Sequence, residues 1–285
     1  MKLDKKNLKR KWKGIGFIIP HFIGVTIFFL IPYIDVFIRS INFKSDDGIF
    51  SNYSTVIDIE PFILAVKNTV KFIVISLPLL IVLSLLVAVA LNSVPTIENF
   101  IKGAMLIPLA IPTVSVVLMW RVMFSNNGFL NAALDRFGFS EKAWLTSGAA
   151  FSVLVISYLW KNLGYYVILW LAILRQVPET VYEAAALETS SKTIVFFRIT
   201  LPIVKNSVFM IVVLAIVNSF KVFREAYLVA GDYPDGSMYL LQHIFSNWFR
   251  NMEVNKMAAG AVLTSIPLFI LIFLFQKCIK TSSNE

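Results

Sequence analysis

The stretch 182–202, YEAAALETSSKTIVFFRITLP, lies between two blocks that are apolar enough to cross a membrane. Its first part is rich in Ala, Leu and Glu, which are good helix formers. Three hydroxyl residues at 189–191 follow, and such side chains compete for backbone hydrogen bonds and suit a helix end or a new cap. A second short segment, about 192–200, leads to Pro202. The pattern predicts a helix, a turn and a second helix on a loop between two spans.

The composition around this loop is that of a membrane protein. Hydrophobic residues make up 58% of the chain, charged residues 15%, and 25 of the 285 residues are Phe. A soluble core of this size does not need so much apolar surface. A spanning helix takes about 20 largely apolar residues. Six such stretches occur, at about 15–38, 68–91, 104–124, 151–174, 203–223 and 258–276.

These stretches predict an all-α integral membrane protein with six transmembrane helices. Several of them contain proline, which lacks the backbone N–H and frees a carbonyl group that must find a partner in neighbouring helices or water. We therefore expect a packed bundle rather than isolated spans.

Basic residues at the N-terminus predict the orientation. Seven Lys or Arg residues precede the first span, opposed only by Asp4, and such clusters resist translocation. We expect a cytoplasmic basic segment at 1–14, a six-helix membrane domain at 15–277 with a cytoplasmic loop at about 175–203, and a cytoplasmic tail at 278–285. The first span is long, contains proline and lacks a small-residue cleavage pattern after it, so we expect it to remain in the mature chain.

The net charge and the cysteine count bear on nucleic-acid binding, disulfide bonds and metal sites. The net charge of +9 comes mostly from the juxtamembrane run, which suits anionic lipid headgroups, so we expect membrane lipids and no nucleic acid as partners. The single cysteine, Cys278, excludes an internal disulfide and a cysteine-cluster metal site. His21 and His243 lie far apart without carboxylate-rich spacing, and we expect no metal.

Nucleotide chemistry is not expected on this chain. It contains no GxxxxGK[ST] phosphate loop, so it should neither bind nor hydrolyse ATP alone. A stand-alone pump or channel would need a continuous chain of intramembrane ionisable groups, and an intramembrane enzyme would need a catalytic pair within the spans. Neither pattern is evident, which favours a non-enzymatic role.

The loop has the features of a docking helix. Pro178 and Glu179 suit the first turn of a helix. The small residues at 184–186 allow close approach to another surface, and Glu183 offers a carboxylate to a basic partner. Helix physics alone leaves a second reading open, an amphipathic segment lying on the headgroups.

The order Glu183-Ala184-Ala185, a helix break and then Ile199-x-Leu201-Pro202 resembles the EAA loop of ABC importer permeases. In that family this loop forms a coupling helix that docks in a cleft of the ATPase subunit. The family usually has Gly where Thr189 stands, after an acidic residue. We therefore expect the turn to differ here and the helix still to dock on the ATPase subunit. The resemblance implies the following coupling residues: Glu183, Ala184, Ala185, Leu187, Glu188, Thr189, Leu201 and Pro202.

Other segments resemble the sugar-permease branch of the same family. They are Trp160, Gly164, LWLAILRQVPETVYEAA, MWRVMFSNNGFLNAAL and NSFKVFREAYLVAGD, in the family's order. The resemblance implies a type I ABC importer permease fold and a maltose-permease-like subunit of a carbohydrate importer in a prokaryotic inner or plasma membrane, with both termini cytoplasmic. A non-sugar small solute is the nearer alternative, and a stand-alone channel or intramembrane enzyme a remote one.

The resemblance also implies partners. They are a second homologous permease subunit, two ABC ATPase domains that carry ATP and Mg²⁺, and an extracellular solute-binding protein. We expect no cofactor on this chain itself. In sugar permeases a Gly-Gly-Pro turn in the last external segment helps to meet the binding protein, and this chain has Gly-Asp-Tyr-Pro at 231–234 instead.

Candidate substrate contacts gather on the fourth span. Sugars are held by hydrogen bonds and by stacking on aromatic rings. Lys161 lies near the middle of an apolar block, where a cation is costly unless it faces water, a partner or a substrate. The alternatives are that the aromatic residues pack or lie at the interface and that Lys161 pairs with a carboxylate of the second permease. The expected pathway residues are Trp160, Lys161, Asn162, Tyr165, Tyr166, Asn218 and Lys221.

Overall fold

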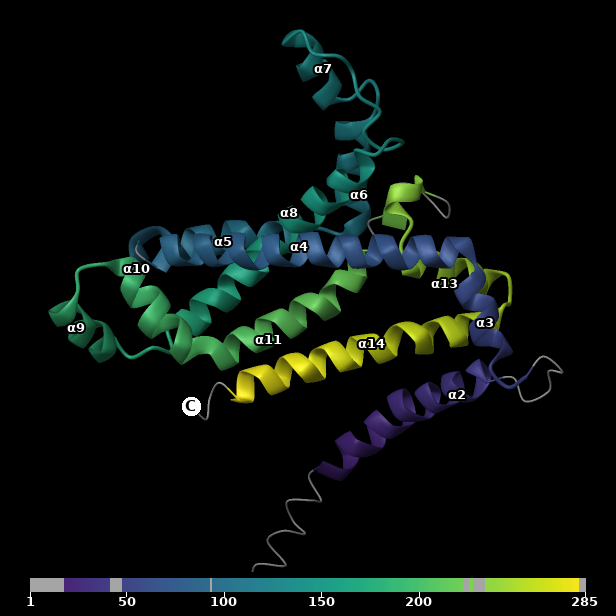
Figure 1. Ribbon diagram of the computed structural model, residues 1–285. Helices are drawn as coiled ribbons and strands as arrows, with labels where there is room; N and C mark the ends of the chain where they lie inside the picture. The colour runs from purple at the N-terminus through teal and green to yellow at the C-terminus, as the bar shows by residue number, and fades with distance from the viewer. Residues whose placement is uncertain (1–17, 42–47, 93, 223–225, 228–233, 282–285) are drawn as a thin grey trace, which may run out of the picture. The chain divides into compact units, whose positions relative to one another are not determined.

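The structure is a computed structural model that describes residues 18–41, 48–92, 94–222, 226–227 and 234–281 (Figure 1). Within these residues every regular element is a helix or a helical turn. Five helices are long and apolar enough to cross a membrane: Ile18–Ser40, α4 (Glu60–Asn92), α8 (Ala150–Leu174), Lys192–Ser219 and Val254–Leu274. A pair of helices bent at a short break brings the count among the described residues to six when it is taken as one broken span. The predicted all-α fold with six spans is confirmed.

The third predicted span, 104–124, is divided into two helices at Ile111–Pro112. α5 (Pro95–Ala110) ends before Ile111, and α6 (Thr113–Phe124) begins after Pro112. The arms Phe100–Ala110 and Thr113–Arg136 are bent by 88° at this break. Ile111 has extended backbone (φ −70°, ψ 131°), because the ring of the following proline disfavours the helical region for the residue before it. Pro112 also lacks the N–H that would continue the helix.

Two other prolines are accommodated without a break. A π-helical turn, Thr26–Leu30, precedes Pro32 of α2 (Ile31–Ser40), and a second one, Phe196–Thr200, precedes Pro202 of α11 (Leu201–Ser219). A proline ring clashes with the carbonyl four residues before it, and the wider π turn makes room for that ring. The fifth predicted span, 203–223, therefore begins earlier, as one helix from Lys192 to Ser219.

The chain divides into two compact units. The first covers Met1–Ile59 and Trp248–Leu268, and its described part holds α2, α3 (Ser51–Asp58) and the first part of α14 (Val254–Thr281). In this unit the hydroxyls of Tyr33 and Ser265 lie 3.3 Å apart, which ties the first span to the last.

The second unit, Glu60–Asn247 with Phe269–Glu285, contains the predicted coupling loop and pathway residues. α8 is its central helix and packs against α4, α5 and α11. It also carries the largest fully buried side chains, Trp170 and Tyr166. α7 (Phe129–Arg136) and α13 (Leu241–Arg250) are the shorter helices of the segments that join these spans.

α5 crosses α8 at Gly164, where the two backbones touch. A Cβ atom at position 164 would overlap the carbonyl oxygen of Met105 on α5. Small residues allow such close approach between membrane helices, where packing rather than the hydrophobic effect drives association. Gly164 therefore sets the distance between α5 and α8.

Gly164→Ala is expected to destabilise the protein by about 1–3 kcal/mol or more, because a backbone atom cannot move aside as a side chain can. The measurement is the thermal unfolding midpoint in detergent. Gly103→Ala on α5 is the matched control, since a Cβ there meets nothing within 4 Å. Equal midpoints for the two variants would contradict the assigned crossing.

Candidate functional site

The predicted coupling loop folds around α9 (Glu179–Glu188). Pro178 stands at its N-cap with extended backbone, and Glu179 lies in the first turn, where a carboxylate favours the positive end of the helix dipole. The helix ends when Thr189 N–H donates to the carbonyl oxygen of Ala185 at 3.0 Å. These bounds agree with the predicted start and with the predicted break at Thr189.

The turn after α9 is built from side-chain hydroxyls. Thr189 is extended (φ −153°, ψ 141°), a conformation open to any residue, so glycine is not required there. Its Oγ1 accepts from the N–H of Ser191 at 3.2 Å. Ser191 Oγ in turn accepts from Ile194 N–H at 3.4 Å and caps α10 (Lys192–Val195). The departure from glycine at 189 therefore introduces no backbone strain.

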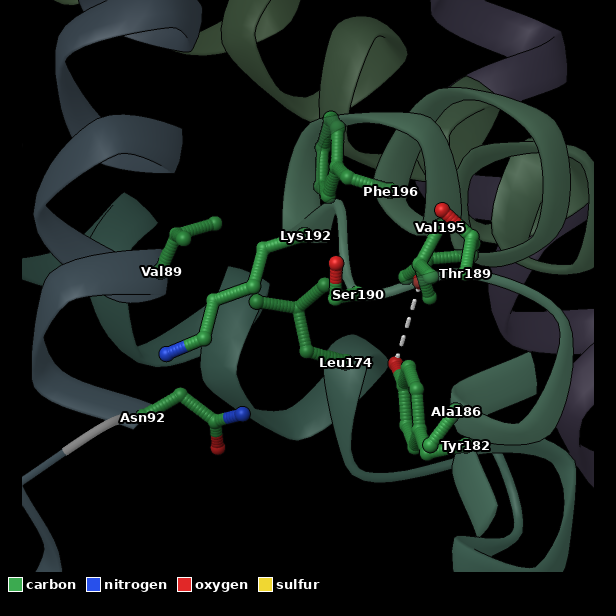
Figure 2. Close-up of a pocket in the computed structure, with 11 residues that line it drawn as sticks. Val89, Asn92, Leu174, Tyr182, Ala186, Thr189, Ser190, Lys192, Val195 and Phe196 are labelled. Atoms are coloured by element: carbon green, nitrogen blue, oxygen red, sulfur yellow. Dashed lines mark hydrogen bonds between the residues drawn. The ribbon is translucent and has the colours of Figure 1, made fainter. Parts of the chain in front are cut away.

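A hydrogen bond ties α9 to the next span. The Thr200 hydroxyl donates to the Tyr182 hydroxyl at 3.2 Å, as Figure 2 shows. Thr200 is buried, Tyr182 is half-buried, and Ala185 one turn on is only 4% exposed. This side of α9 packs against the chain itself.

The other side of α9 is open. Glu183, Ala184, Leu187 and Glu188 are exposed, and Leu187 is 91% exposed. Their spacing of three and four residues places them on neighbouring positions of one surface. We call these four residues the α9 face. Ala185 does not belong to it, and Leu201 and Pro202 lie at the start of α11 rather than on α9.

Behind α9 lies a cavity of about 550 Å³ (Figure 2). It is bounded by the end of α4, the end of α8, α9, the hydroxyl turn and the start of the next span. No sequence motif indicated it, because its walls come from segments far apart in the chain. Its lining residues are Val89, Asn92, Leu174, Tyr182, Ala186, Thr189, Ser190, Lys192, Val195, Phe196 and Thr200.

Two of the predicted pathway residues meet the bent third span. Lys161 Nζ donates to Thr113 Oγ1 at 2.9 Å, at the first residue of α6. The Trp160 ring packs edge-on against Trp120, with centroids 5.5 Å apart. Both residues are half-buried. Sequence reasoning missed Thr113 and Trp120, although the intramembrane lysine signalled that some partner was needed.

A second group lies between α8 and α11. Asn218 Nδ2 donates to the Tyr166 hydroxyl at 3.1 Å, and Tyr165 packs edge-on against Tyr166 with centroids 5.2 Å apart. Tyr166 is fully buried, whereas Tyr165 and Asn218 are half-buried. Asn162 Nδ2 donates within α8 to the carbonyl of Tyr158 at 2.8 Å.

The predicted pathway residues therefore fall into two groups. Trp160 and Lys161 lie beside the bent third span, and Tyr165, Tyr166 and Asn218 lie between α8 and α11. Tyr166 has no surface open to a solute in this conformation. The Lys221 side chain lies outside the described residues.

The segment before α13 is anchored to α4. Asn68 Nδ2 donates to the carbonyls of Gly236 and Tyr239, at 2.6 and 3.0 Å. Asp235 Oδ1 accepts from the hydroxyl and the N–H of Ser237, at 2.6 and 2.9 Å, and these bonds hold the pKa of Asp235 below its usual value. Of the Gly-Asp-Tyr-Pro turn, only Pro234 lies within the described residues.

The family model for the binding-protein-dependent transport system inner membrane component matches residues 68–282. The chain belongs to this family. Its described spans agree with a multi-pass component of an inner membrane.

Curated relatives of this inner membrane component match it over most of its length. The arabinooligosaccharides transport system permease protein AraP of Bacillus subtilis is 28% identical and covers 94% of this chain and 88% of its own. The trehalose/maltose transport system permease protein MalF of Thermococcus litoralis is 28% identical, with 94% and 93% covered. The sn-glycerol-3-phosphate transport system permease protein UgpA of Yersinia pestis is 24% identical, with 88% of each covered.

Solved structures show the same fold. A chain of a bacterial alginate ABC transporter, in complex with an alginate pentasaccharide-bound periplasmic protein, superposes with a TM-score of 0.80 at 22% identity, covering 95% of this chain and 94% of that one. A second structure, of a bacterial ABC transporter involved in the import of alginate, has a TM-score of 0.82 at 21% identity, with 97% and 98% covered. The predicted ABC importer permease fold is confirmed.

Tyr182→Phe removes the hydroxyl that accepts from Thr200 and is expected to loosen α9. A net hydrogen bond is worth about 0.5–1.5 kcal/mol, so amide exchange in 179–188 should become about two- to tenfold faster. Hydrogen exchange with mass spectrometry measures this directly. Thr200→Ser keeps the donor and should exchange like the parent, whereas unchanged exchange in Tyr182→Phe would show that the bond does not hold the helix.

Proposed function

We propose that this chain is one membrane subunit of an ATP-driven, binding-protein-dependent importer of a sugar or oligosaccharide. It forms half of the translocation path, and the α9 face receives the movement of an ATPase subunit. The observation that carries the coupling role is the exposed α9 face on an EAA-type helix held between two spans. The cargo class is supported by relatives named for arabinooligosaccharide and trehalose or maltose transport.

The proposed partners follow from this role. A second homologous permease completes the path, two ABC ATPase domains supply ATP hydrolysis with Mg²⁺, and an extracellular solute-binding protein delivers the cargo. A likeness to a transporter solved with a periplasmic protein supports the last of these. The chain itself is a non-enzymatic transport subunit, and both termini and α9 lie in the cytoplasm.

The geometry of the loop suits the transmission of force. On one side, Gln176 follows α8 directly, and its Oε1 accepts from the Ser207 hydroxyl on α11 at 3.3 Å. On the other side, Tyr182 of α9 is bonded to Thr200, and the helix from Lys192 runs without interruption to Ser219. Both hydrogen bonds end on the same span, Lys192–Ser219, and residues 175–178 join α9 to α8 along the chain. A displacement of α9 would therefore be passed to this span and to α8.

Alternating access follows from this linkage. Closure of the ATPase pair on ATP would draw the coupling helices together and rock the two bundles from inward-facing to outward-facing. In this cycle Glu183 offers its carboxylate to a basic group of the ATPase, while Ala184 and Leu187 provide a small apolar contact.

The proposed path runs along α8 and α11. Lys161, Tyr165 and Asn218 are half-buried and polar, which suits hydrogen bonding to a sugar as the bundle opens. A cargo with a phosphate is the second candidate, because one relative is named for sn-glycerol-3-phosphate transport.

Glu183→Lys is expected to abolish coupling, since it reverses the charge in the middle of the α9 face without touching a buried group. Uptake and binding-protein-stimulated ATPase activity of the reconstituted complex should fall at least about tenfold, the effect of about 1.4 kcal/mol. Glu141→Lys, an exposed carboxylate outside this loop, is the charge-matched control. Normal activity in an assembled Glu183→Lys complex would show that Glu183 has no role in docking on the ATPase subunit.

Lys161→Met is expected to lower uptake about tenfold or more, because hydrogen bonds to a charged group are worth about 1.5–3 kcal/mol. The measurement is uptake of radiolabelled cargo at equal amounts of assembled complex in the membrane. Uptake and assembly equal to those of the parent would show that Lys161 does not contribute to the translocation path.

A further inference from the structure

Part of the lining of the cavity behind α9 has no place in the coupling role. Val89, Asn92, Leu174, Lys192 and Phe196 belong neither to the α9 face nor to the Tyr182–Thr200 bond. The α9 face points away from the chain, whereas the cavity lies on the other side, among Tyr182, Ala186 and the ends of the spans. A volume of about 550 Å³ lies within the range of small-ligand sites, about 300–1,000 Å³.

The lining has an apolar part and a polar part. Val89 and Leu174 come from the ends of α4 and α8, and Val195 and Phe196 from the start of the next span. The polar part is formed by Asn92 and by the hydroxyl turn with Lys192. A single ligand with an apolar chain and a polar head would match both parts.

The charge of the polar part favours an anion. Lys192 is exposed and forms no ion pair with any residue that the structure describes. In Figure 2 its ammonium group extends toward Val89 and Asn92 of α4. The Asn92 amide and the Ser190 hydroxyl can both donate to an oxyanion.

The position of the cavity favours a lipid over a soluble anion. α4 ends at Asn92 and α8 at Leu174, so the cavity lies where the apolar spans give way to the polar loop. This is the level of phospholipid headgroups, where basic residues attract anionic lipids. Val89 is 42% exposed, so the apolar wall continues onto the outer surface of α4.

We propose that this cavity is a binding site for an anionic phospholipid, with its phosphate on Lys192, Asn92 and Ser190 and the start of an acyl chain against Val89 and Phe196. The bound lipid would stabilise the turn at 189–191 from the cavity side. The position of α9 would then depend on the lipid composition of the membrane. This inference rests on the membrane placement of the chain. It depends neither on the proposed contact with an ATPase subunit nor on the identity of the transported solute.

The test is native mass spectrometry of the full-length chain, purified in detergent and titrated with dioleoyl-phosphatidylglycerol. Dioleoyl-phosphatidylcholine tests the headgroup charge, and inorganic phosphate tests a soluble anion. Phosphatidylglycerol is expected to bind more tightly than phosphatidylcholine. Lys192→Ala should weaken it about five- to tenfold, as the loss of one basic contact near the membrane surface implies.

Matched variants separate this site from general lipid binding. Arg198→Ala removes an exposed cation from the same segment outside the cavity, and Lys192→Arg keeps the charge; both should bind like the parent. Val89→Trp fills the cavity from α4 and should displace the lipid. Val82→Trp, two turns earlier at an exposed position (52%) that does not line the cavity, should leave it in place.

Three results would overturn the proposal. One is phosphatidylglycerol binding that is unchanged by both Lys192→Ala and Val89→Trp. Another is equal affinity for the two lipids. The third is inorganic phosphate that competes with phosphatidylglycerol or binds in its place through Lys192, because this would identify a soluble phosphate compound as the ligand.

Discussion

Inside hydrocarbon every backbone N–H and C=O group needs a partner from the protein itself, and each proline within a span withholds one donor. The permease meets this constraint differently at Pro202 and at Pro112, and both prolines lie beside a proposed functional region. A π turn before Pro202 lets one helix run from the coupling loop at Lys192 to Ser219. A full break at Ile111–Pro112 starts α6 at Thr113, and the hydroxyl of that residue then accepts from Lys161. The proposed coupling loop and the proposed pathway therefore both depend on how the chain accommodates proline.

The local features of this chain could be predicted from the sequence, because they depend on neighbouring residues. The break at Thr189 follows from the hydroxyl run, and the ends of the fourth span lie within a residue of the predicted 151–174. The bend of the third span was signalled by Pro108 and Pro112, but composition alone does not tell a kinked helix from a broken one. α5 continues through Pro108, while the chain breaks at Pro112.

Contacts between distant segments could not be predicted in this way. Asn218 and Tyr166 are 52 residues apart, Lys161 and Thr113 are 48 apart, and nothing in either local pattern specifies the partner. Gly164 shows the same limit: its place in the family pattern could be recognised, but its role in bringing α5 onto α8 appears only with the backbone of Met105 beside it. The cavity behind α9 is assembled from the end of α4, the end of α8 and the stretch 182–200, and no sequence pattern indicated it.

In the proposed coupling role, the α9 face contacts an ATPase subunit. The most direct measurement is chemical crosslinking of a single cysteine placed at Leu187 in a Cys278→Ser background, within the complex isolated from its native membrane. Leu187→Cys should give an adduct with the ATPase, and Phe197→Cys, also at an exposed apolar position, should give none. Adducts at Phe197→Cys without any at Leu187→Cys would contradict the account.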